Sequence, residues 1–170
     1  LVKGGKAGNL PEPPNPIPVP VFIRVIGDKG QGQGQMRLPV GVAVGQQAKL
    51  FVADTQNNRI EIFNAMAEYE AEFGRHGSAV GNFNQPEGVA MATGPDGKLY
   101  VADRMNNRVQ VFDAEGGYIK SIGGTAGVQF NQPSGVAIDA EGSIYVADTM
   151  NNRVVGLDSG GSFLLEFGAS

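Results

Sequence analysis

The stretch that decides the fold is residues 99–112, which read LYVADRMNNRVQVF. Two short runs of apolar, β-branched and aromatic residues, which favour strands, lie on either side of a polar turn. Nearly the same letters recur at residues 50–63 (LFVADTQNNRIEIF) and at residues 144–157 (IYVADTMNNRVVGL). The chain therefore contains an internal repeat, and a repeat is the first feature from which a fold is predicted.

The length of the repeat indicates what each copy builds. The aspartate of the Val-Ala-Asp triplet recurs as Asp54, Asp103 and Asp148, at intervals of 49 and 45 residues. Each interval holds four short strand-like runs separated by Gly, Asp or Asn turns. Four strands in about 45 residues is the size of a propeller blade. We predict an all-β protein with three four-stranded blades, at approximately residues 36–74, 84–123 and 131–168.

The repeated letters also carry a resemblance to a known family. Pro-x-Gly-Val-Ala, followed by an apolar residue, Tyr or Phe, and Val-Ala-Asp-x-x-Asn-Asn-Arg, resembles the NHL repeat. The resemblance covers Val21–Gly168 and occurs three times. It implies a partial β-propeller over residues 21–170, in a family that includes protein-binding and RNA-binding modules and a minority of enzymes.

The first twenty residues differ from the repeats. Six of the ten residues from Pro11 to Pro20 are proline. Because proline fixes φ and lacks an N–H donor, residues 1–20 are predicted to form an extended arm. The arm is either a stiff spacer or a segment that docks on a neighbouring subunit. The following stretch, Val21–Gly27, matches the last strand of a blade and is predicted to be an orphan strand.

The turn between the two repeated runs holds the residues that we single out as a structural motif. Aspartate is expected to accept hydrogen bonds from backbone N–H groups two residues on, and asparagine tolerates left-handed geometry. The arginine that follows can bind a carboxylate or a carbonyl of the adjacent blade. The turns lack the second carboxylate, the glycine and the distal glutamate of a calcium loop, so no metal is expected there. The motif residues are Asp54, Asn58, Arg59, Asp103, Asn107, Arg108, Asp148, Asn152 and Arg153.

Glycine marks two further features. Gly41, Gly88 and Gly135 each precede a Val-Ala pair, and we predict that they let innermost strands approach closely. The segment Gly30–Gln35 is rich in glycine but lacks the Lys-Ser/Thr pair of a phosphate loop. It is predicted to be a flexible connection between blades.

Composition excludes some classes of function. The 170 residues include 13 basic and 17 acidic side chains without a basic cluster, which argues against nucleic-acid binding. The absence of cysteine excludes disulfides and thiolate metal sites, and no apolar run reaches the length of a transmembrane segment. The amidating lyase of the family uses a histidine-ligated zinc, which the single histidine, His76, cannot supply.

These observations favour a non-catalytic protein-interaction or scaffolding module, without catalytic, cofactor-binding or metal-binding residues. An arc of three blades leaves two apolar flanks for protein partners or for self-association, so we expect a subunit of a larger assembly or a self-completing oligomer. The alternative is a calcium-dependent, lactonase-like hydrolase formed when two chains close a six-bladed ring. An extracytoplasmic location, periplasmic or secreted, is expected from the acidic, glycine-rich composition, the lack of cysteine and the start at Leu1.

Overall fold

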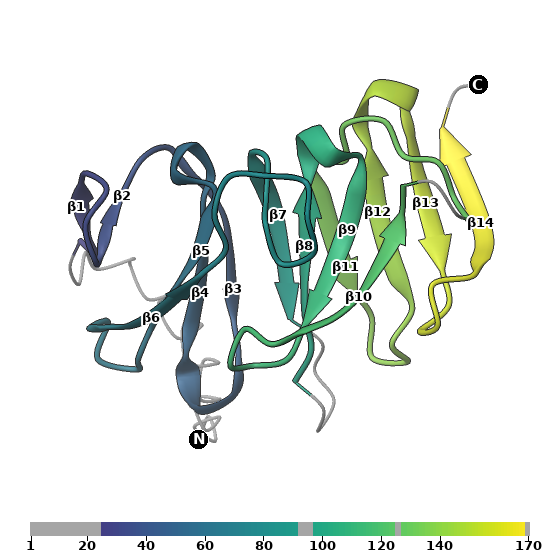
Figure 1. Cartoon of the computed structure of the whole chain (residues 1–170). Coiled ribbons are helices and arrows are strands. Elements are labelled where there is room, and N and C mark those ends of the chain that lie inside the picture. Colours follow the sequence, from purple (N-terminus) through teal and green to yellow (C-terminus); the bar gives the residue numbers. More distant parts are fainter. Residues whose placement is uncertain (1–24, 92–96, 125–126, 169–170) are drawn as a thin grey trace, which may run out of the picture.

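The fold is all-β, as predicted, and consists of three four-stranded antiparallel sheets in chain order (Figure 1). The computed structural model describes residues 25–91, 97–124 and 127–168. The first sheet comprises β3 (Pro39–Val44), β4 (Leu50–Asp54), β5 (Arg59–Phe63) and β6 (Tyr69–Phe73). The second comprises β7 (Pro86–Met91), β8 (Leu99–Asp103), β9 (Arg108–Phe112) and β10 (Tyr118–Gly123). The third comprises β11 (Gly135–Ile138), β12 (Ile144–Asp148), β13 (Arg153–Leu157) and β14 (Phe163–Gly168).

Each sheet is a meander in which every strand pairs with the next one in the chain. The two apolar runs of the repeat are therefore the two central strands of each sheet. A single 3-10 turn joins them: η2 (Thr55–Asn57), η3 (Arg104–Asn106) and η4 (Thr149–Asn151). A fourth such turn, η1 (Gln46–Ala48), precedes β4. Within the described residues, none of these turns is long or apolar enough to cross a membrane.

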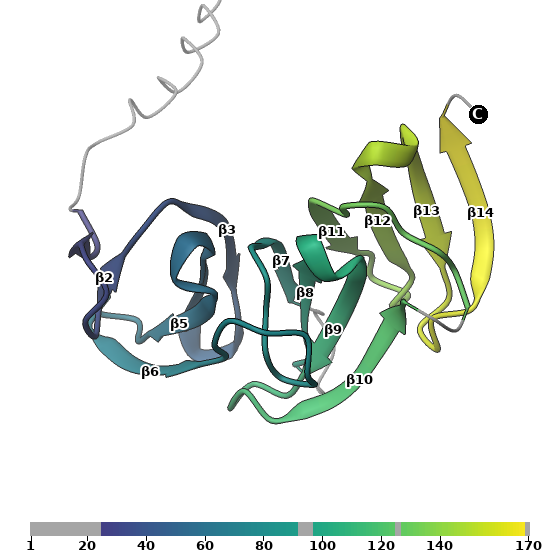
Figure 2. The same cartoon turned by 45° about the horizontal axis from the view of Figure 1, so that its top comes forward.

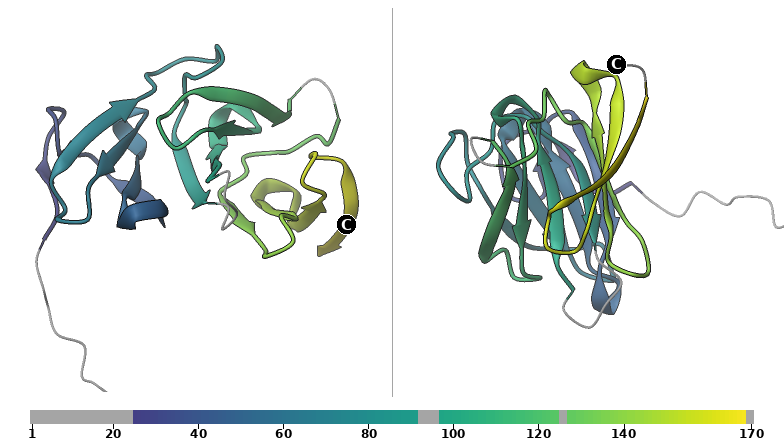
Figure 3. Two further views of the ribbon diagram at one scale, coloured as in Figure 1. Left: turned by 90° about the horizontal axis from the view of Figure 1, so that it is seen from below. Right: turned by 90° about the vertical axis from the view of Figure 1, so that its right-hand side faces the viewer.

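The three sheets follow one another along an arc, as the blades of a partial β-propeller do (Figures 2 and 3). The first strands, β3, β7 and β11, contact one another in succession. The last strands, β6, β10 and β14, lie at the outer edges. We refer to the sheets as the first, second and third blades.

The hydrophobic core lies between the blades, because alternate residues of a strand point to opposite faces of its sheet. Each blade therefore has an upstream face, turned toward the blade before it, and a downstream face, turned toward the blade after it. The core between the first and second blades contains Phe51, Ala53, Ile60, Ile62, Phe83, Val89, Leu99, Val101 and Phe112. The core between the second and third contains Tyr100, Val109, Val111, Ile122, Phe130, Ile144, Val146, Val155 and Leu157.

The inner-strand glycines lie where neighbouring blades approach most closely. A Cβ atom on Gly41 would overlap the carbonyl oxygen of Glu87, and one on Gly88 would lie 2.7 Å from the Cα atom of Gly135. Only glycine leaves room for such approach. Gly135 is different, because a Cβ atom placed on it would meet first the Cβ of Ala147 in its own blade, at 3.3 Å.

The extra strand element predicted before the first blade is present, but its described part lies after Gly27. Residues 1–24, which include the proline-rich arm, lie outside the described residues, and residues 25–27 form no strand. The extra element is instead a short parallel pair, β1 (Asp28–Lys29) with β2 (Gln35–Met36). Residues 30–34 connect this pair.

Candidate interaction surfaces and the repeated turn

The aspartate of each turn is a buried anchor for the segment that enters its blade. Asp54 accepts hydrogen bonds from the backbone amide of Arg37 at 2.7 Å, from Asn57 Nδ2 at 2.7 Å and from Arg59 Nε at 2.9 Å. Asp103 and Asp148 repeat this arrangement and, like Asp54, are fully buried. The amide that each aspartate binds lies 17 to 19 residues earlier in the chain, not two residues later as expected.

The arginine of each turn joins the aspartate to the connection before the blade. Arg59 binds the carboxylates of Asp54 and Glu72, both in its own blade. Its Nη2 atom donates to the carbonyl oxygens of Gly32 and Gln35 at 2.8 and 2.6 Å. Arg108 reaches two carbonyls of the matching connection in the same way, and Arg153 reaches one. The Gly30–Gln35 connection is therefore held by hydrogen bonds, and the carbonyls belong to the connection rather than to a strand of the adjacent blade.

The two asparagines of each turn have different tasks, and the sequence pattern pointed only to the second. The first, Asn57 in the first blade, binds the aspartate. The second adopts left-handed backbone geometry, with φ of 57° at Asn58, 54° at Asn107 and 53° at Asn152. Asparagine is one of the few residues that tolerate this conformation.

The second asparagine also links one blade to the next. Asn58 Oδ1 accepts a 2.8 Å hydrogen bond from the backbone amide of Gln85, in the second blade's entry segment. Asn107 Oδ1 accepts the equivalent 2.8 Å bond from Gln132, in the third blade's entry segment. Within the described part of the chain, the side chain of Asn152 makes no such bond.

The residues that donate to these asparagines share a strained backbone. Gln85 and Gln132 have φ of 53° and 49°, and Leu38, at the same position before the first blade, has φ of 52°. Such geometry is uncommon outside glycine and persists where surrounding contacts enforce it. Each residue precedes the proline at the entry to an inner strand. Among the described residues, the amide of Leu38 has no acceptor.

The first blade contains a buried carboxylic acid whose pKa is perturbed. Glu61 is fully buried, its Oε1 atom accepts a hydrogen bond from the amide of Gly34, and the same oxygen forms an ion pair with Arg59 Nη2 at 2.9 Å. Its Oε2 atom has no hydrogen-bond partner. Burial, which disfavours the charged form, raises the pKa of Glu61 to about 7, against the opposing charge of Arg59 and with the help of nearby Asp54. The carboxyl group of Glu61 therefore gains or loses its proton near neutral pH.

The two ends of the arc expose apolar side chains. On the upstream face of the first blade, Val42 is 60% exposed, whereas its counterpart in the second blade, Val89, is 8% exposed. On the outer strand of the third blade, Phe167 is 55% exposed, whereas its counterpart in the second blade, Ile122, is 6% exposed. Further exposed apolar residues on these two strands are Val40, Val44, Phe163, Leu164 and Leu165.

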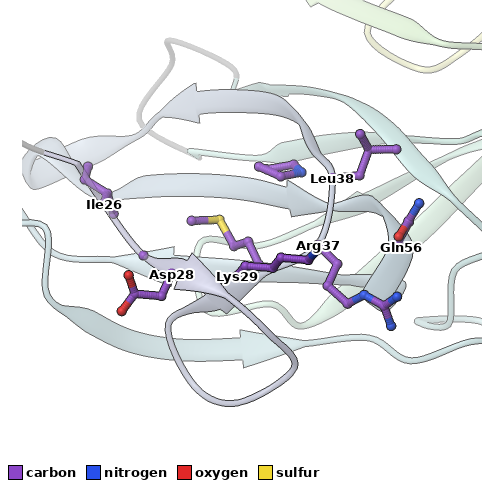
Figure 4. Close-up of a pocket in the computed structure, with 9 residues that line it drawn as sticks. Ile26, Asp28, Lys29, Arg37, Leu38 and Gln56 are labelled. Carbon is purple, nitrogen blue, oxygen red and sulfur yellow. The ribbon is translucent and has the colours of Figure 1, made fainter.

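A pocket of about 380 Å³ lies beside the open end of the first blade (Figure 4). Ile26, Met36, Arg37, Leu38 and Gln56 are among the residues that line it. A second pocket, of about 330 Å³, lies over the junction of the first two blades and includes Asn58, Gln85 and the exposed His76. Within the described ranges, no group of three or more His, Cys, Asp or Glu side chains is arranged to hold a metal ion.

The repeated turn, the four-stranded meander and the inner glycines together define the repeat unit. A known repeat family matches two copies of this unit. The NHL repeat family matches residues 83–112 and 130–157. The chain carries NHL repeats. The first blade, which lies outside the matched residues, has the same strand order and the same Asp-Asn-Arg contacts as the two matched blades. The chain is 32% identical over 101 residues to "Protein brain tumor" of Drosophila melanogaster, over 59% of this chain and 10% of that protein.

Solved structures share the propeller fold of the NHL blades. Hydrazine synthase of Kuenenia stuttgartiensis superposes with a TM-score of 0.60 at 24% identity, over 84% of this chain and 40% of that one. Streptogramin B lyase gives a TM-score of 0.59 at 13% identity, over 75% and 39%. At these identities the likeness concerns the fold alone. The chain spans about two fifths of these proteins and a tenth of the Drosophila relative.

Proposed function

We propose that this chain is a non-catalytic protein-interaction module, and that the open faces at the two ends of its arc bind protein partners. The observation that carries the proposal is the exposure of Val42 and Phe167 at positions whose counterparts in the neighbouring blade are buried. Apolar clusters of this kind on a protein surface mark interaction sites. The repeated turn residues have structural partners in their own blade, in the connection before it and in the next blade's entry segment, which supports a structural role for them.

The experiment that tests this function places a photo-crosslinking amino acid at Phe167 or at Val42 in cells that produce the chain. A matched control carries it at Val80, which is equally exposed but lies in the connection between the first and second blades. Protein adducts are expected from the two face positions and not from Val80. Equal yields at all three positions would contradict the proposal.

The alternative, a calcium-dependent lactonase-like hydrolase, remains a separate prediction with its own test. Its calcium ligands would come from residues around the central channel of a closed ring, contributed by two chains. Hydrolysis of a lactone by the purified chain, abolished by a chelator and restored by calcium, would replace the non-catalytic assignment. We expect no turnover above the rate of the buffer with calcium.

An extracytoplasmic location belongs to the same proposal. Cell fractionation of the producing organism tests it, with the chain expected in the periplasmic or secreted fraction. Recovery in the cytoplasmic fraction alone would contradict it.

A further inference from the structure

The two open faces are copies of faces that are paired with each other inside the chain. The upstream face of the first blade repeats that of the second, with the same strands in the same register. The downstream face of the third blade repeats that of the first, again with matching central strands. Since the first blade's downstream face packs on the second blade's upstream face, the two open faces carry the two halves of an interface that the chain already forms.

The apolar residues of this interface have counterparts on the two open faces. In the first blade, Phe73 packs on the second blade's Phe83 and Phe112, with ring centroids 6.1 and 4.8 Å apart. Phe167 occupies the position of Phe73, since each pairs with the second residue of its neighbouring central strand. On the first blade's upstream side, Met36 occupies the position of Phe83 and lines the open pocket. Phe63 occupies the position of Phe112 but is 2% exposed, because it already packs on Tyr69 of its own blade.

The hydrogen-bonding halves match as well. Inside the chain, the second asparagine of each turn accepts from the amide that precedes the next blade's proline. Asn152 is the acceptor of this kind on the third blade, and the amide of Leu38 is the donor of this kind on the first. Leu38 also has the left-handed φ of Gln85 and Gln132. Leu38 and Pro39 line the 380 Å³ pocket at the open end.

The backbone leaves room for the same contact. A Cβ atom on Gly41 would overlap the carbonyl oxygen of Glu87, and one on Gly88 would lie 2.9 Å from the carbonyl oxygen of Ser134. Gly135 is the corresponding glycine of the third blade, and among the described residues no neighbouring blade fills the space in front of it. The carbonyl of Val40, the counterpart of Glu87, is the group that would enter this space.

We propose that the downstream face of the third blade binds the upstream face of the first blade in a second copy of this chain. This inference rests on the proposed interaction function and names its partner. Asn152 accepts from the amide of Leu38 in the second copy, and Phe167 packs on its Met36, which lines the pocket at the open end. The contact is head to tail, and two such contacts related by a twofold axis close a six-bladed ring.

The test uses the full chain and two variants, each of which places a charge on one face. Phe167→Glu alters only the downstream face, and Val42→Glu alters only the upstream face. Both positions are exposed within one chain, so circular dichroism and thermal melting of the monomer are expected to remain unchanged. Val80→Glu is the matched control at an exposed apolar position away from both faces.

Light scattering on a size column at tens of micromolar is the measurement. The wild type and Val80→Glu are expected at twice the 17.8 kDa of one chain, and each face variant alone at 17.8 kDa. In a mixture of the two face variants, the intact downstream face of Val42→Glu can bind the intact upstream face of Phe167→Glu. The mixture should therefore show the doubled mass. A face-to-face dimer would show no such rescue. Asn152→Gly should weaken self-association at least about tenfold.

Three results would overturn the proposal: a wild-type monomer, face variants that remain dimeric, or a mixture that stays monomeric. A wild-type monomer whose Phe167 and Val42 crosslinkers still capture other proteins would overturn the second copy as partner and leave the interaction function standing. A wild-type monomer without crosslinked adducts would contradict both the second copy as partner and the interaction function.

Discussion

Glu61 occupies in the first blade the position that Gln110 occupies in the second. Gln110 Oε1 accepts from the amide of Gly81, and its Nε2 donates to Asn82 and Asp103 at 2.7 and 3.2 Å. Glu61 Oε1 accepts from Gly34 in the same manner, but its Oε2 has nothing to donate unless it carries a proton. The buried site is therefore built for a donor, and a charged carboxylate is the poorer occupant.

Glu61→Gln is expected to stabilise the chain at neutral and alkaline pH. The folded state raises the pKa of Glu61 from 4.5 to about 7, so it binds the proton more tightly than the unfolded state does. Between these values the free energy of unfolding of the wild type falls as the pH rises, and the loss is complete above pH 7. The variant should lack this loss and gain on the order of 1–3 kcal/mol there.

Urea unfolding at pH values from about 4 to 8.5 checks this result. The two proteins should have similar stability at the acid end and diverge between pH about 4.5 and 7. Gln110→Glu is the reciprocal control and should introduce the same pH dependence into the second blade. Lower stability of Glu61→Gln at the alkaline end would contradict the assignment.

Asp103→Ala should lower the free energy of unfolding by about 3–5 kcal/mol, because it leaves a buried arginine without its partner. It also removes the acceptor of the Asn84 amide. Asp148→Ala should cost less, since Arg153 is 27% exposed whereas Arg108 is 12% exposed. Chemical denaturation ranks the two variants. If the two variants lost the same free energy of unfolding, the burial of the ion pair would not determine the size of the loss.

Gly88→Ala should destabilise the chain by several kcal/mol, because its Cβ would meet backbone atoms of the third blade that cannot move aside without separating the inner strands. Gly135→Ala meets only the Cβ of Ala147 at 3.3 Å and should change the stability of the monomer by less than about 1 kcal/mol. Thermal melting of dilute chains separates the two. A severe loss at Gly135 would show that the open face is already packed in the monomer.

Asn107→Gly isolates the hydrogen bond between blades, because glycine keeps the left-handed conformation and loses only the side chain. Loss of the bond to the Gln132 amide should cost about 1 kcal/mol. Asn152→Gly, which removes no such bond, should leave the stability of the dilute monomer nearly unchanged. Hydrogen exchange of the Gln132 amide provides a second measurement and should accelerate only in Asn107→Gly.

Much of the architecture could be predicted from the repeats. The three blades and the all-β class are confirmed, and the NHL repeat is confirmed for the second and third blades, because a repeat with apolar runs on both sides of a turn leaves few other folds. The extra strand element before the first blade is also present, but as the pair β1–β2 rather than at residues 25–27, and residues 21–24 lie outside the described residues.

Less of the candidate site could be predicted from the sequence. The pattern drew attention to Asp54 and Arg59 but not to their partners, since the amide of Arg37 lies 17 residues earlier and joins them only after the blade has folded. Asn57 could have been noticed, because it recurs as faithfully as Asn58. Nothing in the sequence around Glu61 marks it as unusual. Only its alignment with Gln110 shows that an acidic residue replaces a neutral amide at this position.

The sequence by itself determined which residues form strands, where the turns require asparagine or glycine, and how many blades the chain supplies. These properties are local and depend on β-propensity, alternation and left-handed geometry. The tertiary structure alone decided which face of each blade is covered, and therefore why Val89 is buried and Val42 is not. The two valines lie in equivalent strands. They differ because Val89 has a neighbouring blade that removes it from water, whereas Val42 has none among the described residues.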